Sequence, residues 1–188
     1  MELETERLRL REFKSADRST VFEYQNDPRY LQYYAWTKRS RHDVENFVRL
    51  FIEQQKETPR TKYQLVVELK GDSQLIGNCG IRMHSRAARE ADIGFEITPA
   101  LWGQGLATEA SSAMLTFGFV HLKVHRISSW CIAENIASSR VLENLGLRQE
   151  GRLRENEYFK GRCWDTLLYA ILKDEWQPQN NPLKSITE

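Results

Sequence analysis

A glutamate and a glycine-containing loop stand close together in the middle of the chain: the carboxylate can exchange protons, and the loop can bind a ligand through its backbone. Glu96 lies in the stretch ADIGFEIT, where apolar and polar residues alternate. The loop Gly103–Ala107 follows shortly after it. Its two glycines let the backbone turn tightly and expose N–H groups to a ligand. A carboxylate beside such a loop could take a proton from a nucleophile, directly or through water.

The elements around this loop would turn it into an anion site. Alternation over Asp92–Thr98 predicts a strand, which Pro99 ends. Apolar residues at helical spacing from Ala107 to Phe117 predict a helix directly after the loop. The free N–H groups and the positive end of that helix would face a ligand, and phosphate is the usual one. The alternative is that the glycines serve only the packing of a strand-to-helix turn.

The spacing of the loop excludes two common phosphate motifs and resembles a third. Neither G-x-G-x-x-G nor G-x-x-x-x-G-K-[ST] is present. After Trp102 the residues read x-x-G-x-A up to Ala107. This pattern, directly after a strand that carries a glutamate, resembles the coenzyme A pyrophosphate loop of the GCN5-related N-acetyltransferases (GNAT). In that family the first position is usually Gln or Arg, and here it is Trp102.

A second stretch resembles the same family. From Asn135 to Leu147 the chain follows the run N-x-x-S-x-R-x-L-E-x-L-G-L that is typical of RimJ/RimL-type acetyltransferases. By its own residues this stretch predicts a helix with Asn135 as N-cap and Gly146 just after its end. It follows the glycine loop in the order and at the spacing of the family, and the resemblance extends from TERLRLR to LKDEW.

The resemblance implies a fold as well. It is an α/β (α+β) GNAT fold, with a mixed, mostly antiparallel sheet of about seven strands. The sheet would splay between its fourth and fifth strands, with helices on both faces and coenzyme A in the gap. The length favours one domain, so we expect a single N-acetyltransferase domain over residues 1–176 and a loose, polar C-terminal tail over residues 177–188.

The activity implied by the resemblance is transfer of an acetyl group from acetyl-CoA to a primary amine, by direct attack in a ternary complex. Glu96 would be the general base, and Ser138 would protonate the departing thiolate. Backbone at Ile97 and the side chain of Asn135 would bind the pantetheine arm. The pyrophosphate would be held by backbone N–H groups of Trp102, Gly103, Gln104, Gly105, Leu106, Ala107 and Thr108.

Each of these roles has a plainer alternative. Glu96 could be a solvated residue, or the partner of an arginine in the basic loop Arg82–Arg89. Asn135 and Ser138 could be only the cap and third residue of their helix, although both roles can coexist.

The acceptor is the least defined part of the prediction. Aromatic side chains at Tyr33, Tyr34, Trp36 and Trp164 are candidates for an acceptor groove, although aromatic clusters are more often plain core. The resemblance favours a protein or peptide N-terminal α-amine. A small amine such as an amino acid, a polyamine or an aminoglycoside stays open, and so does a non-catalytic coenzyme A-binding module.

Composition sets limits on partners and location. With 27 basic and 26 acidic residues the net charge is +1, so nothing points to direct nucleic-acid binding. We expect no membrane insertion, because no apolar run approaches about 18 residues. The charged N-terminus is unlike a signal peptide, so the cytoplasm is the simplest location. A homodimer stays open.

Cysteines and histidines predict neither a disulfide nor a metal site. Cys79, Cys131 and Cys163 are widely separated, and each lies in an apolar segment, as reduced thiols in a core do. No His or Lys is placed to activate Cys131 as a nucleophile. His121 and His125 straddle an expected helix-to-strand junction without a third ligand, so we interpret them as structural.

Overall fold

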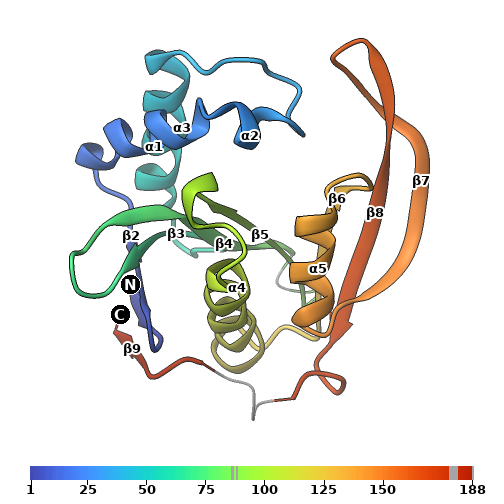
Figure 1. The fold of residues 1–188 in the computed structure, drawn as a ribbon. Helices are drawn as coiled ribbons and strands as arrows, with labels where there is room; N and C mark the ends of the chain where they lie inside the picture. The colour runs from blue at the N-terminus through green and yellow to red at the C-terminus, as the bar shows by residue number, and fades with distance from the viewer. Residues whose placement is uncertain (86, 88, 178–181, 188) are drawn as a thin grey trace.

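The computed structural model describes residues 1–85, 87, 89–177 and 182–187. Nine strands of this part of the chain form one sheet in the order β7-β8-β6-β5-β4-β3-β2-β1-β9 (Figure 1). The strands are β1 (Glu2–Glu4), β2 (Leu8–Glu12), β3 (Lys62–Leu69), β4 (Leu75–Ser85), β5 (Glu90–Ile97), β6 (Arg126–Ile132), β7 (Arg148–Phe159), β8 (Arg162–Leu172) and β9 (Ser185–Thr187).

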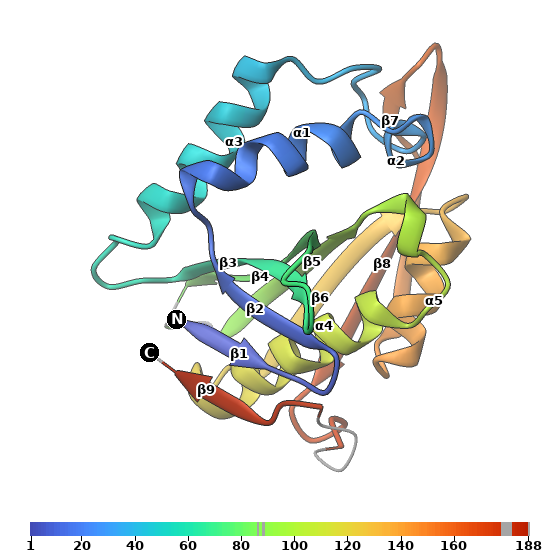
Figure 2. The ribbon, with the colours of Figure 1, turned by 60° about the vertical axis from the view of Figure 1, so that its left-hand side comes forward.

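Helices cover both faces of the sheet. Figures 1 and 2 show α1 and α3 above the central strands and α4 on their other side, with α5 beside α4. The helices are α1 (Arg18–Gln25), α2 (Pro28–Leu31), α3 (Arg41–Gln54), α4 (Leu106–Thr116) and α5 (Ile136–Asn144). Single 3₁₀ turns span Ser15–Asp17 and Pro99–Leu101, and a π-helical turn, Phe117–His121, follows α4.

The sheet is antiparallel except at one place. The strands β5 and β6 run parallel and pair only over Glu90–Asp92 and Arg126–Ser128, whereas β5 stays paired with β4 as far as Ile97. The C-terminal half of β5 therefore parts from β6. These two strands are the expected fourth and fifth strands, so the predicted splay between them is confirmed. The sheet has nine strands rather than about seven mainly because of β1 and β9, which are only three residues long.

Local signals explain most helix boundaries. Ser40 caps α3, and its hydroxyl and the carboxylate of Asp43 form a capping box. Asn135 caps α5, because its side chain accepts from the N–H of Ser138. Gly146, at a φ of +85°, ends the same helix.

The core has two main parts, one on each side of the sheet. The larger cluster packs α4 and α5 against the sheet through residues such as Ile81, Met114 and Leu142. A second cluster lies under α1 and α3, around Val21 and Val48. A small third cluster joins Ile132, Phe159 and Trp164 to Tyr33.

The C-terminal tail is not loose throughout. Ser185–Thr187 pair with β1, and Ile186 and Leu183 pack against the larger core cluster. The tail therefore runs from the β8 side of the sheet to its opposite edge, and the two chain ends come to lie side by side (Figure 2). Residues 178–181 and 188 lie outside the described part of the tail.

Candidate active site

The carboxylate of Glu96 is held by four neutral donors. Its Oε2 accepts from the Tyr24 hydroxyl at 3.2 Å, Gln25 Nε2 at 3.1 Å and Asn78 Nδ2 at 2.8 Å. Among the described residues, its Oε1 accepts from one donor, the Tyr34 hydroxyl, at 3.3 Å. A carboxylate oxygen has about two lone-pair sites. The free capacity to take a proton is therefore on Oε1.

These donors keep their protons at neutral pH. Burial, followed by the negative charge of Glu96, raises the pKa of the Tyr24 hydroxyl well above its ordinary value. The same two causes, in the same order, raise the pKa of Tyr34. Both tyrosines thus remain hydrogen-bond donors to the carboxylate.

A buried polar network fixes Asn78, the cross-strand partner of Glu96. Asn78 is only 2% exposed, and its Oδ1 accepts from Gln64 Nε2 at 2.6 Å. A Cβ at Gly80 would come within 2.1 Å of Gln64 Oε1, so only glycine leaves room for this contact. Farther along the same sheet face, Arg82 Nε donates to Asp92 at 2.7 Å. The network makes the surroundings of Glu96 rigid.

The alternative of an arginine partner for Glu96 finds no support in the described part of the Arg82–Arg89 loop. Arg82 pairs with Asp92, and Arg89 Nε donates to the carbonyl of Lys123. Positions 86 and 88 of the loop lie outside the described residues.

The glycine loop is shaped by two left-handed residues and fastened from both sides. Gly103 has a φ of +78°, and Gly105, the N-cap of α4, has a φ of +75°. Arg7 Nη1 donates to the carbonyl of Gln104 at 2.9 Å, while Arg7 Nε pairs with Glu109 in the first turn of α4 at 2.6 Å. The N-cap residue Gly105 has no side chain to cap the first N–H groups of α4. They are open to an anion.

Trp102 closes the other side of the loop. Its indole N–H donates to the carbonyl of Ile97 at 2.6 Å. The N–H of Thr98 bonds to Ile76 on β4, so strand alternation turns the N–H of Ile97 away from β4 and toward the gap. One backbone donor at the end of β5 therefore faces the opening between β5 and β6.

Asn135 and Ser138 do make the helix-cap contact that the plainer alternative describes. The side chain of Ser138 also forms a hydrogen bond with the thiol of Cys131. Burial raises the pKa of this thiol to about 11, and the hydrogen bond with Ser138 offsets part of the rise. Both residues belong to the start of α5, which packs on β6 on the face opposite to Glu96. The structure thus sets Glu96 and Ser138 on the two sides of the β5–β6 gap.

Tyr34 and Trp36 form one aromatic group beside Glu96. Tyr34 stacks on Tyr30 and on Trp36, with ring centroids 4.7 Å apart in each pair. The guanidinium of Arg39 lies 4.8 Å from the centre of the Trp36 ring. Tyr34 therefore joins this stack directly to the Glu96 carboxylate.

Tyr33 and Trp164 lie apart from that stack. Trp164 is 7% exposed and donates its indole N–H to the carbonyl of Phe159. Tyr33 packs edge-on against it at 5.9 Å and donates its hydroxyl to the carbonyl of Glu134. These two aromatics tie the segment after α2 to the β7–β8 hairpin.

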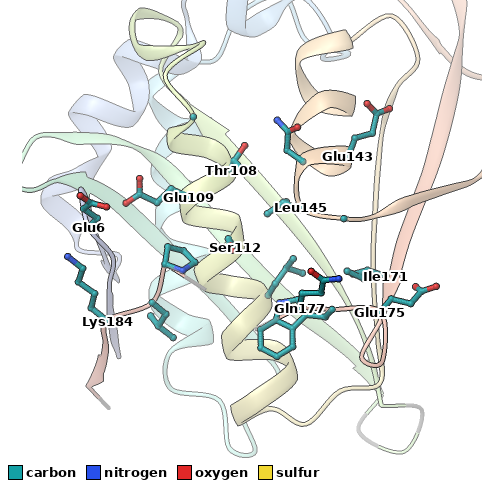
Figure 3. Close-up of a pocket in the computed structure, with 17 residues that line it drawn as sticks. Glu6, Thr108, Glu109, Ser112, Glu143, Leu145, Ile171, Glu175, Gln177 and Lys184 are labelled. Atoms are coloured by element: carbon teal, nitrogen blue, oxygen red, sulfur yellow. The ribbon is translucent and has the colours of Figure 1, made fainter. Parts of the chain in front are cut away.

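One cavity begins at the glycine loop and not at Glu96. Its volume is about 980 Å³, and it lies between α4, the end of α5 and the C-terminal tail (Figure 3). Thr108 and Ser112 of α4 line one side, Leu145 another, and Gln177 of the tail closes it. A ligand anchored at the start of α4 would have room to extend into this cavity.

The cysteine prediction needs one correction. Cys79 and Cys131 are buried, as expected, but Cys163 is exposed. Its neighbour Trp164 points into the core, and strand alternation then turns Cys163 outward. Over the described residues, no three His, Cys, Asp or Glu side chains lie close enough together to hold a metal. No helix in this part of the chain is long and apolar enough to cross a membrane.

Sequence reasoning missed several residues of the site. Tyr24, Asn78 and Arg7 contact Glu96 or the glycine loop, but only through pairings between distant parts of the chain. For Asn78 a signal was present, because a polar residue sits among apolar ones in QLIGNCGI.

Comparison with known proteins agrees with this geometry. The family model for the acetyltransferase (GNAT) domain matches residues 7–148. The uncharacterized N-acetyltransferase p20 of Bacillus licheniformis is 30% identical over 93% of this chain and 97% of its own length. The chain belongs to the GNAT family, and it is an N-acetyltransferase. A coenzyme A-binding module without catalysis is not favoured.

Solved structures share the fold. A GNAT-family acetyltransferase from Bacillus anthracis superposes with a TM-score of 0.80 and 31% identity, covering 93% of this chain and 99% of that one. RimL, a ribosomal L7/L12 α-N-protein acetyltransferase determined with coenzyme A, gives a TM-score of 0.81, with 93% and 99% of the two chains covered. At 18% identity, RimL shows likeness of fold alone.

Proposed function

We propose that this protein transfers the acetyl group of acetyl-CoA to a protein or peptide N-terminal α-amine. In this proposal it is a RimJ/RimL-type enzyme whose single catalytic domain spans residues 1–176. The observation that carries the proposal is the Glu96 carboxylate beside the β5–β6 gap. Its Oε2 accepts three hydrogen bonds, whereas its Oε1 accepts one from the described residues and can still accept a proton. RimL, which shares the fold, acts on α-amines by its name and was determined with coenzyme A.

Acetyl-CoA binding would use the open donors of the site. The N–H groups at the start of α4, with the left-handed Gly103 and Gly105, suit a pyrophosphate. The N–H of Ile97 and the side chain of Asn135 would bind the pantetheine arm from the two sides of the gap. Arg7 holds the loop in shape and adds positive charge near it.

The reaction then needs one base and one acid. The amine nitrogen attacks the thioester carbonyl, so that a C–N bond forms and the C–S bond breaks. The proton lost by the amine goes to Glu96 Oε1, directly or through water. The hydroxyl of Ser138 gives its proton to the departing thiolate and regains one from solvent.

Glu96→Gln tests the base. We expect kcat to fall about 10²- to 10⁴-fold, because the amide cannot take the proton. Stabilisation by coenzyme A in a thermal-shift assay should stay as in the wild type. Turnover is measured as thiol release from acetyl-CoA against N-terminal peptides, amino acids, polyamines and aminoglycosides.

The matched control is Glu53→Gln, an exposed carboxylate on α3, which should leave turnover unchanged. Unchanged turnover in Glu96→Gln itself would remove Glu96 from the mechanism. A protein that coenzyme A does not stabilise would contradict the proposed binding at the glycine loop.

A further inference from the structure

Trp130 is a large apolar side chain open to solvent on the sheet face that carries Glu96. It is 61% exposed, more than Trp36 or Trp102. Asp92 of β5 pairs with Ser128 of β6. Because alternate residues share a face, Trp130 lies on the same face as Asp92 and Glu96.

The neighbours of Trp130 form an apolar wall. Its cross-strand partner on β8 is Leu168. Leu168 in turn lies over Gly151 of β7, where an added Cβ would be 3.7 Å from Leu168 Cδ1. Ile132, two residues after Trp130 on β6, belongs to the small third core cluster, against which Tyr33 packs. The other face of β6 packs against α5, so the exposure of Trp130 is confined to the Glu96 side.

The position of Trp130 suits the second residue of a peptide. Trp130 lies two residues beyond Ser128, as Gly94 lies two residues beyond Asp92, so both residues stand just past the last β5–β6 pair, where the gap begins. Two residues of a strand span about 7 Å. Consecutive Cα atoms of a peptide are about 3.8 Å apart. A peptide whose amine reaches Glu96 and whose chain runs across the start of the gap would therefore bring its second side chain toward the Trp130 ring.

Three carboxylates of β5 and β7 near this face are already paired with arginines. Arg82 pairs with Asp92, and Arg126 pairs with both Glu90 and Glu150. A polyamine needs carboxylates to balance its further ammonium groups, whereas these carboxylates are matched by arginines. An apolar side chain that packs against Trp130 needs no carboxylate to balance a charge.

We propose that Trp130 is a specificity-determining residue, which binds an apolar side chain at the second position of the acceptor peptide. The proposal rests on acetyl transfer at Glu96, as proposed above. The occupant is the acceptor rather than a second copy of the chain, because the exposed ring shares its face with the base and stands at the start of the gap beside which the base lies.

Two tetrapeptides test the proposal, both beginning with alanine and differing only in leucine or glycine at the second position. For the wild type we expect the leucine peptide to have the higher kcat/KM. Trp130→Ala should lower kcat/KM for the leucine peptide about tenfold and change the glycine peptide less than twofold. Trp130→Phe, which keeps an apolar ring, should retain most of the preference.

Controls separate specificity from folding. The exposed Trp130 is replaced without opening the core, so stabilisation by coenzyme A should be the same in Trp130→Ala and in wild type. Val120→Ala, another exposed apolar position, should leave both peptides unaffected.

Several outcomes would overturn the proposal. An equal effect on the two peptides, or no effect, removes Trp130 from specificity. An equal effect with a changed oligomeric state in size-exclusion chromatography identifies a contact between copies instead. Turnover of polyamines but of neither peptide overturns this inference and leaves acetyl transfer standing. If no acceptor of the panel is acetylated, the proposed function fails with it.

Discussion

In the part of the chain that the structure describes, the carboxylate of Glu96 is surrounded by neutral donors and contacts no cation. Four uncharged groups hold the carboxylate, and they come from α1, from β4 and from the segment after α2. A neutral shell leaves the charge of the base available to an incoming ammonium group, which an arginine partner would offset. The donors lie up to 72 residues from Glu96 in the chain. Local patterns could therefore predict the glutamate but not its neighbours.

The three cysteines should differ sharply in reactivity. Burial raises the pKa of Cys79 and of Cys131 to about 11, so both thiols stay protonated at pH 8. Cys163 is exposed on β8. We expect iodoacetamide at pH 8 to modify Cys163 in the native protein and all three cysteines after denaturation, as read by mass spectrometry.

The control for this experiment is Cys163→Ser, which should leave the native protein unlabelled. Rapid modification of Cys131 at pH 8 would contradict the raised pKa. It would also reopen a covalent acyl-enzyme route.

At the scale of elements, the glycine loop depends on a residue from the other end of the domain. Arg7 precedes β2 and bonds both to the loop carbonyl of Gln104 and to Glu109 of α4. The side chain of Arg7 is 48% exposed, so solvent weakens the ion pair. Its geometric role remains, because two bonds from one guanidinium fix the loop relative to α4.

Arg7→Ala should therefore weaken coenzyme A binding about tenfold, through a less ordered loop rather than through loss of the fold. Isothermal titration of coenzyme A measures the Kd. Arg9→Ala is the matched control, since Arg9 is similarly exposed and pairs with Glu2 away from the loop. Equal Kd values for the two variants would contradict the role of Arg7.

The elements that could be predicted are those with local signals. The caps of α3 and α5 and the strand before the glycine loop follow from residues close in sequence. The short helix α2 was not predicted. Asp27 caps it and Pro28 begins it, although the same proline also signals the end of α1. A helix of four residues is too short to show a period.

At the scale of the whole molecule, the tail covers an edge that would otherwise be open. Without β9, the strand β1 would present unpaired N–H and C=O groups, and such edges promote association. Trp176 also packs on Phe119 at 5.3 Å. The tail could not be predicted, because β9 spans three residues and pairs with the far end of the chain.

A chain that ends at Gln177 should consequently have a lower Tm and a stronger tendency to self-associate. Differential scanning fluorimetry and size-exclusion chromatography at several concentrations measure the two effects. Ile186→Ser in the full chain should lower Tm by less, because it keeps the backbone pairing and loses only the packed side chain. A truncated chain with unchanged Tm would show that β9 contributes little.

The short β5–β6 ladder divides the sheet into two lobes that share one narrow hinge. Three residue pairs join them, and just beyond these the hydroxyl of Ser129 donates to the carbonyl of Ile93 at 2.9 Å. Few ladder bonds need to break for the lobes to move apart there. A ligand that bonds to β5 on one lobe and to α5 on the other would hold the two lobes together at the hinge. Binding should then raise the cooperativity of unfolding, and without ligand each lobe should open more nearly on its own.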